Sequence, residues 1–215
     1  MPQPPVYSRF EAAWVPFAPD RSRQAASDLA WQWAARQAAA RGRPVISIGG
    51  GRSANSGPVF GRRAGGRGLA PDAPLRDGPG AVVLCNPTFD LLGWAGQLSA
   101  GSALAVVGDR GPHRLTGWAG AVGAVNLDTG ERSRLDASLR DCLTTLAGYD
   151  MNGHTSDLGS AHRLLADMAA AGRLERAVIL GALVGFGVSA KGLAAVAELI
   201  DLILPVATWL ATPSD

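Results

Sequence analysis

Lysine is almost absent from this chain of 215 residues. Lys191 is the single lysine among 20 basic residues, and the others are arginines. A P-loop needs the motif G-x-x-x-x-G-K-[ST] to cradle nucleotide phosphates, and no glycine-rich segment before Lys191 contains a lysine. This absence argues against a P-loop NTPase. The heavy use of arginine, alanine and glycine is typical of a bacterial genome rich in G and C.

Cysteine and long uncharged apolar runs are scarce as well. Cys85 and Cys142 lie far apart and form no C-x-x-C motif, so we expect both to be buried and reduced, without a disulfide or a cysteine metal site. The most apolar segment, residues 193–211, contains Glu198, Asp201 and Pro205, whereas a spanning helix needs about 20 residues with few charges. The first 20 residues show no secretory signal pattern. We therefore expect a cytoplasmic protein without a membrane span.

Neither sign of charge dominates the chain. Lys and Arg number 20 against 18 Asp and Glu, for a net charge of +2, which argues against bulk electrostatic binding of nucleic acid. Hydrophobic residues make up 47% and charged residues 18%, enough apolar material for a packed core. The length is that of one domain with a small appendage.

Short apolar runs alternate with segments of helical spacing in the first two thirds of the chain. The runs cover residues 44–48, 81–85, 103–107 and 124–127. Helical spacing occupies residues 88–98 and 115–122, and a first helix follows Asp20 as its N-cap. This alternation predicts an α/β fold, a Rossmann-like parallel sheet of four to five strands flanked by helices.

The chain divides into three expected parts. Residues 1–19, rich in proline and aromatics, are expected to form an extended N-terminal arm. Residues 20–135 are expected to form the α/β ligand-binding domain. Residues 136–215 carry only helical patterns, beginning at the cap Asp136, and are expected to form a C-terminal helical extension packed on that domain.

Residues 49–80 form a glycine- and arginine-rich loop. They contain ten glycines and five arginines against two aspartates, a local net charge of +3. A loop of this length without its own secondary structure is usually functional or disordered. Three interpretations stay open: a floppy insertion, a mobile lid over an anionic ligand, and contact with single-stranded nucleic acid. The last lacks interleaved aromatics, because Phe60 is the only one.

The loop begins with a G-x-G-x-x-A pattern directly after a predicted strand. The dinucleotide-binding fingerprint is incomplete, because residues 55–58 break the helix that should follow and no acidic residue occupies its expected place. We interpret the segment as a glycine turn that binds phosphate or a ribose hydroxyl. Its predicted ligand-binding residues are Gly49, Gly50 and Gly51 as backbone donors, Arg52 as a charge clamp, and Ser53 and Asn55 as side-chain contacts.

Polar residues follow the next predicted strands. In open α/β sheets, ligands bind outside the carboxyl ends of the strands. Asn86 is therefore a predicted ligand contact, and Asp109 a predicted ribose contact or general base. Thr88 and Asp90 fit a simpler role as helix cap and first-turn acid, and Asp128 a role in a turn.

A second polar cluster occupies residues 149–157. His154 is its candidate general acid or base. Its spacing of eight residues from His162 is not diagnostic of a metal site, so we predict no metal ligands, and the residues identify no cofactor.

Residues 183–193 have the rhythm of a helix-turn-helix, but the second helix is too apolar to read DNA bases. We expect it to pack on the body or to form a homodimer contact. The apolar residues that suggest a partner are Leu202, Ile203, Leu204, Val206 and Trp209.

The sequence favours a protein that binds a small anionic ligand, a nucleotide or nucleotide-derived metabolite, at the strand ends. Hydrolase or transferase chemistry fits better than redox chemistry, because the dinucleotide fingerprint is incomplete. The alternative is a non-enzymatic interaction or assembly protein that uses the glycine-arginine loop and the apolar C-terminal helices to bind protein or nucleic acid.

Overall fold

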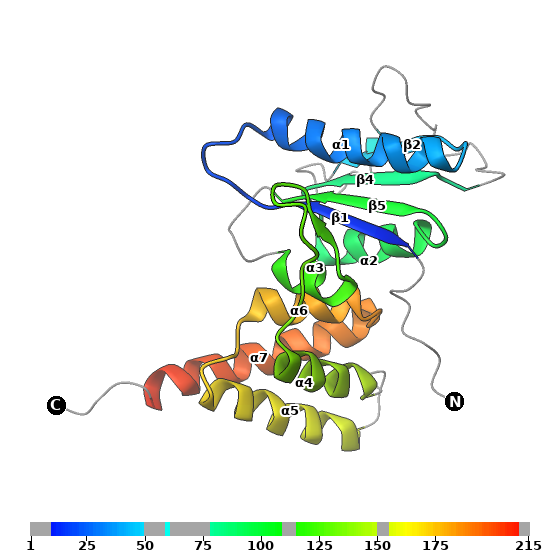
Figure 1. Ribbon diagram of the computed structural model, residues 1–215. Coiled ribbons are helices and arrows are strands. Elements are labelled where there is room, and N and C mark those ends of the chain that lie inside the picture. Colours follow the sequence, from blue (N-terminus) through cyan, green and yellow to red (C-terminus); the bar gives the residue numbers. More distant parts are fainter. Residues whose placement is uncertain (1–9, 50–58, 61–77, 109–114, 150–154, 211–215) are drawn as a thin grey trace.

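The computed structural model describes residues 10–49, 59–60, 78–108, 115–149 and 155–210, and these residues form an α/β fold around one sheet (Figure 1). The sheet has the order β3-β2-β4-β5-β1-β6. Five of its strands run parallel: β1 (Glu11–Val15), β2 (Val45–Gly49), β4 (Ala81–Cys85), β5 (Ala103–Val107) and β6 (Val125–Asn126). The short β3 (Val59–Phe60) pairs antiparallel with β2 at one edge. The predicted parallel α/β sheet is confirmed.

Seven helices accompany the sheet in the described part of the chain. They are α1 (Arg23–Ala40), α2 (Phe89–Leu98), α3 (Thr116–Val122), α4 (Ala137–Gly148), α5 (Thr155–Ala170), α6 (Arg176–Gly185) and α7 (Ala190–Leu210). Figure 1 shows α1 alone over one face of the sheet, with α2 and α3 on the other face and the remaining helices beyond them. The predicted C-terminal helices are confirmed.

The face beneath α1 is built from small residues. Alternate positions of the strands, such as Ala13, Ala103 and Ala105, form one core cluster with the buried face of α1. That helix contributes four buried alanines and Trp33. Because alanine projects little beyond the backbone, the helix lies close to the sheet, and this layer needs no further helix to close it.

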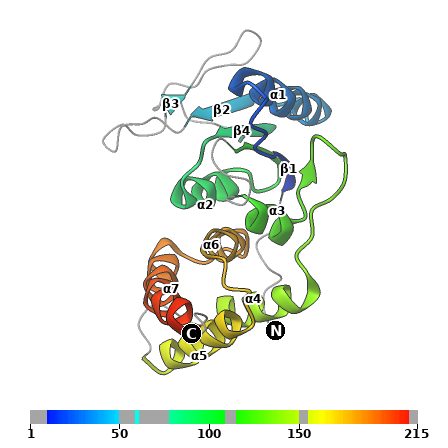
Figure 2. The same cartoon turned by 90° about the vertical axis from the view of Figure 1, so that its left-hand side faces the viewer.

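The opposite face carries larger side chains and continues into the C-terminal helices. One core cluster joins sheet residues such as Ile48 and Leu104 to residues of α2 through α7. Figure 2 shows α6 at its centre, and every residue of this helix from Ile179 to Gly185 is buried. At Gly117 of α3, an added Cβ atom would lie 1.9 Å from the carbonyl oxygen of Val178, so only glycine permits this approach of α3 and α6.

Two local expectations differ from the structure. Residues 11–15 lie in the segment assigned to an extended arm, yet they form β1 between β5 and β6, because their backbone groups complete the hydrogen bonding of both neighbours. The N-cap of α1 is Ser22 and not Asp20, since the Ser22 hydroxyl accepts a hydrogen bond from the Ala25 amide at 3.1 Å.

Other local expectations are confirmed. Thr88 caps α2 through its hydroxyl, and Asp136 caps α4 through its carboxylate. Cys85 and Cys142 form no disulfide with each other, whereas the expectation that both are buried is wrong, because both are half-buried. Within the described ranges, no helix combines the length and apolar character needed to cross a bilayer.

Candidate functional site

The parallel register aligns the carboxyl ends of β2, β4 and β5 at one edge of the sheet. Gly49 pairs with Cys85, and Cys85 pairs with Val107. Gly49, Asn86 and Gly108 therefore lie at the ends of three adjacent strands. Neighbouring strands of a sheet are about 4.8 Å apart. Of the residues predicted for the site, Gly49 and Asn86 are thus brought to a common edge.

The polypeptide leaves this edge in opposite directions at β1 and β5. The connection from β1 leads to α1 on one face, whereas the connection from β5 leads to α3 on the other (Figure 1). Because β1 and β5 are neighbours, a topological switch point lies between them, and in open α/β sheets ligands bind in the crevice at such a point. The Gly108 amide donates to the Val15 carbonyl there at 3.2 Å.

Asn86 has the most unusual geometry at this edge. Its φ of 54° is the only positive value among the described residues other than glycine, although the residue before a proline normally adopts an extended conformation. Its backbone N–H still donates a hydrogen bond to the Val107 carbonyl at 3.1 Å. Its side-chain oxygen Oδ1 is buried and has no hydrogen-bond partner among the described residues.

Such an arrangement is energetically unfavourable unless something compensates it. Asparagine tolerates the left-handed region better than most non-glycine residues, so its backbone costs about 1 kcal/mol there. A buried acceptor left without a partner costs about 1–3 kcal/mol. Strain and unsatisfied polar groups of this kind concentrate at functional sites. Asn86 is therefore the residue that most clearly marks this edge.

The N-terminus of α1 adds a positive field at the same edge. Because α1 follows β1 and α2 follows β4, both helices begin at the carboxyl edge, where the partial positive end of a helix dipole favours an anion. In α2 the first-turn carboxylate of Asp90 offsets this field. The first turn of α1 contains no acidic residue. Farther along, Arg21 pairs with Asp128 at 2.7 Å, so this arginine is already neutralised, and Asp128 belongs to the turn that follows β6.

The other predicted site residues lie outside the described residues. These are Gly50, Gly51, Arg52, Ser53 and Asn55 of the ligand-binding set, and Asp109 and His154 of the catalytic set. Their roles remain predictions. His162 is described and lies exposed on α5. Among the described residues, no three His, Cys, Asp or Glu side chains gather as metal ligands would.

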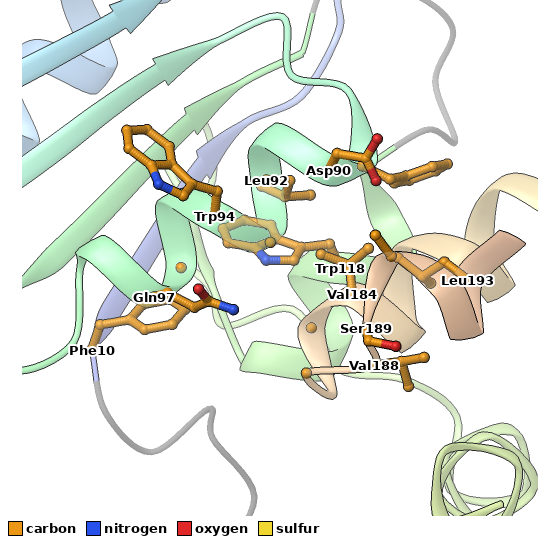
Figure 3. A pocket seen from close by; sticks show the side chains of 16 residues that line it. Phe10, Asp90, Leu92, Trp94, Gln97, Trp118, Val184, Val188, Ser189 and Leu193 are labelled. Carbon is orange, nitrogen blue, oxygen red and sulfur yellow. The ribbon is translucent and has the colours of Figure 1, made fainter. Parts of the chain in front are cut away.

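A groove that the sequence did not indicate lies beneath the sheet, between α2 and the turn that joins α6 to α7 (Figure 3). It encloses about 320 Å³, which falls in the range of small-molecule sites. Its aromatic lining comes from Phe10, Phe89, Trp94 and Trp118, and Asp90 is its one charged residue. Only the packing of α2 against residues almost a hundred positions later creates this groove.

The apolar C-terminal residues are divided between core and surface. Ile203 is buried and Leu204 is half-buried against the core, whereas Leu202 is 67% exposed. On the same helix, the Asp201 carboxylate receives hydrogen bonds from the Arg176 guanidinium at 2.8 and 3.1 Å. These hydrogen bonds hold the pKa of Asp201 below its usual value. The side chains of Val206 and Trp209 lie outside the described part.

Comparison of the chain with models of protein families, with characterised proteins and with solved structures finds no match.

Proposed function

We propose that this protein binds a small anionic ligand, a nucleotide or a nucleotide-derived metabolite, at the carboxyl edge of its sheet. The observation that carries the proposal is Asn86, whose buried Oδ1 has no partner among the described residues and whose backbone is held at a φ of 54°. A ligand hydroxyl or N–H group that bonds to this oxygen removes its desolvation penalty.

The surrounding geometry supports the same ligand class. The N-terminus of α1, which has no acidic residue in its first turn, favours a negative group, and the glycine-arginine loop carries five arginines that suit phosphate binding. The switch point between β1 and β5 lies one strand away from β4, which Asn86 follows, and ligands of open α/β sheets bind at such points. A nucleotide combines the two features that this edge favours, a phosphate for the positive field and ribose hydroxyls for the asparagine.

The alternative, an assembly protein that uses its C-terminal helices, receives less support. Of the apolar residues expected to face a partner, Ile203 is buried and Leu204 is half-buried against the core. Leu202 is the large hydrophobic side chain of this helix that is exposed among those described. Steep, salt-dependent retention on nucleic acid together with no response to nucleotides would favour this alternative.

A thermal-shift panel tests the proposal directly. The probes are adenosine and guanosine monophosphates, adenosine without phosphate, and inorganic phosphate alone. A ligand at about 100 times its Kd stabilises the folded state by about 2.7 kcal/mol, which raises the Tm of a protein of this size by about 5–10 °C. We expect this response to a monophosphate and a smaller one to adenosine or phosphate.

The Asn86→Gly variant links the response to the site. Glycine accepts the backbone conformation but lacks the amide, so the variant should fold and lose most of the response to the monophosphate. Asn126→Gly is the matched control. It removes a side-chain amide of β6 whose Oδ1 accepts a hydrogen bond from the Asp128 backbone N–H. The monophosphate should still raise the Tm of this variant above the value that the variant has without ligand. A panel in which no nucleotide raises the Tm of the native protein would refute the proposal.

A further inference from the structure

The groove between α2 and the α6–α7 turn has an apolar floor and aromatic walls. Trp118 is almost completely buried at 1% exposure, whereas Trp94, on the α2 side, is 40% exposed. Figure 3 shows the Trp118 ring at the centre of the groove, with Phe10 and Gln97 on one side and Leu193 on the other. An indole as exposed as Trp94 beside a cavity of about 320 Å³ is typical of a surface that binds a ligand.

The polar groups of the groove follow α2. Asp90, Trp94 and Gln97 are spaced i, i+4 and i+7, so they lie along one stripe of the helix. Asp90 and Gln97 are seven residues apart, or about 10 Å along the axis. The groove therefore offers a carboxylate at one end, an amide at the other, and apolar surface between them.

Two glycines of α2 keep the groove open. Gly93 and Gly96 both line it, and an added Cβ would meet Val184 at 3.8 Å or Phe10 at 3.7 Å, which are ordinary contact distances. Alanine would therefore fit at both positions, and it would favour the helix by about 1 kcal/mol over glycine. The helix forgoes this stabilisation at two positions where the side chain would make the groove shallower.

The charge of the groove identifies the class of ligand. Asp90 is exposed, and no described residue forms an ion pair or a side-chain hydrogen bond with its carboxylate. The opposite wall, from Val184 to Leu193, contributes no charged residue to the lining. Its Ser189 accepts a hydrogen bond from the Gly192 amide as the N-cap of α7. A carboxylate next to aromatic faces attracts an organic cation, both through its charge and through the negative face of each ring.

We infer that this groove is a second binding site and that it takes a small organic cation with a flat apolar body. Its carboxylate, Asp90, lies in the first turn of α2, so the groove adjoins the carboxyl edge at which this helix begins. The ammonium group binds at Asp90. The apolar body lies against the Trp118 ring, between α2 and the α6–α7 turn, and it excludes water from the cavity. This ligand is opposite in charge to the one proposed for the edge, so the failure of either proposal leaves the other intact.

A pair of probes with the same apolar body and head groups of opposite charge tests the inference. They are 3-phenylpropylammonium and 4-phenylbutyrate, which share a phenyl ring and a three-carbon spacer. Each is titrated into the full chain and followed by tryptophan fluorescence, with Trp94→Phe as the check that the signal arises in the groove. We expect the ammonium compound to bind with a Kd of about 1 mM and about five- to tenfold more tightly than the carboxylate.

Three variants separate the contributions of charge and shape. Asp90→Asn should remove the preference for the ammonium probe, whereas Asp141→Asn, the same change on the exposed surface of α4, should preserve it. Gly96→Ala should weaken both probes and leave the nucleotide response of the edge unchanged.

Three results would overturn the inference. One is the absence of binding by either probe, and another is equal affinity for both probes in the native protein. The third is self-association that is abolished by Trp94→Phe, because the groove would then be occupied by a second copy of the chain.

Discussion

Replacing Asn86 by glycine should make the ligand-free protein more stable while it impairs ligand binding. Glycine adopts a φ of 54° without the steric penalty of a side chain. The substitution also removes Oδ1, the buried oxygen that has no partner among the described residues. Both changes lower the free energy of the folded state relative to the unfolded state.

The expected magnitude follows from three opposing effects. Relief of the left-handed conformation contributes about 1 kcal/mol, and removal of the unpartnered oxygen contributes about 1 kcal/mol at the low end. The added freedom of glycine in the unfolded chain opposes these by about 0.4–1 kcal/mol. The net expectation is a gain of about 1 kcal/mol, equivalent to about 2–4 °C in Tm for a protein of this length.

Urea unfolding of both proteins without ligand measures this gain. Asn126→Gly is the control, because it removes an amide that accepts a hydrogen bond at 2.9 Å and should destabilise the protein by about 1 kcal/mol or more. A loss of 1 kcal/mol or more in Asn86→Gly would show that the asparagine side chain is bonded in the folded protein. The reasoning that assigns it to a ligand would then be refuted.

Three further predictions concern the scaffold. Gly117→Ala should destabilise the protein by about 3 kcal/mol, because its Cβ would overlap α6. Gly93→Ala should instead stabilise the protein by about 1 kcal/mol. Urea unfolding of both variants checks these values, and equal effects would contradict the close packing of α3 against α6. Ser22→Ala should lower stability by about 1 kcal/mol through loss of the α1 cap, and an unchanged Tm would disprove that cap. Arg176 lowers the pKa of Asp201 in the folded protein, so this pair stabilises the fold above pH 3.8, the unperturbed pKa. The contribution is lost as the pH falls through the lower pKa of the folded state. The difference in stability between the native protein and Asp201→Asn should therefore shrink on acidification, and a constant difference would argue against the pair.

The parallel sheet could be predicted because its strands are short apolar runs that end in turn-forming residues. Residues 81–84 and 103–107 are buried on both faces of the sheet, so they appear in the sequence as continuous apolar runs and not as alternating ones. Strand β1 could not be recognised in the same way. It is flanked by prolines and begins with the exposed Glu11, and the evidence for it is its pairing with β5, some ninety residues later.

The N-cap of α1 could not be predicted from the sequence either. Asp20 and Ser22 are both good capping residues two positions apart, and the sequence offers no local reason to prefer one of them. Tertiary contacts distinguish them, since Arg21 is held by Asp128 at 2.7 Å and the helix starts just after it.

The candidate sites differ in how far the sequence could predict them. Asn86 was recognisable from its place at the end of an apolar run, but its left-handed backbone and buried oxygen depend on how β4 meets its neighbours. The groove gave no local signal. Phe10, Trp94 and Val188 come from three distant segments that meet only after α6 packs against α3.

Backbone amide chemical-shift mapping with adenosine monophosphate tests the central claim most directly. We predict saturable shifts concentrated at Gly49, Asn86 and Gly108, the ends of three adjacent strands, with little change at Trp94 and Gln97 in the groove. Shifts spread over unrelated faces of the protein, or none at millimolar nucleotide, would contradict a ligand site at the carboxyl edge of the sheet.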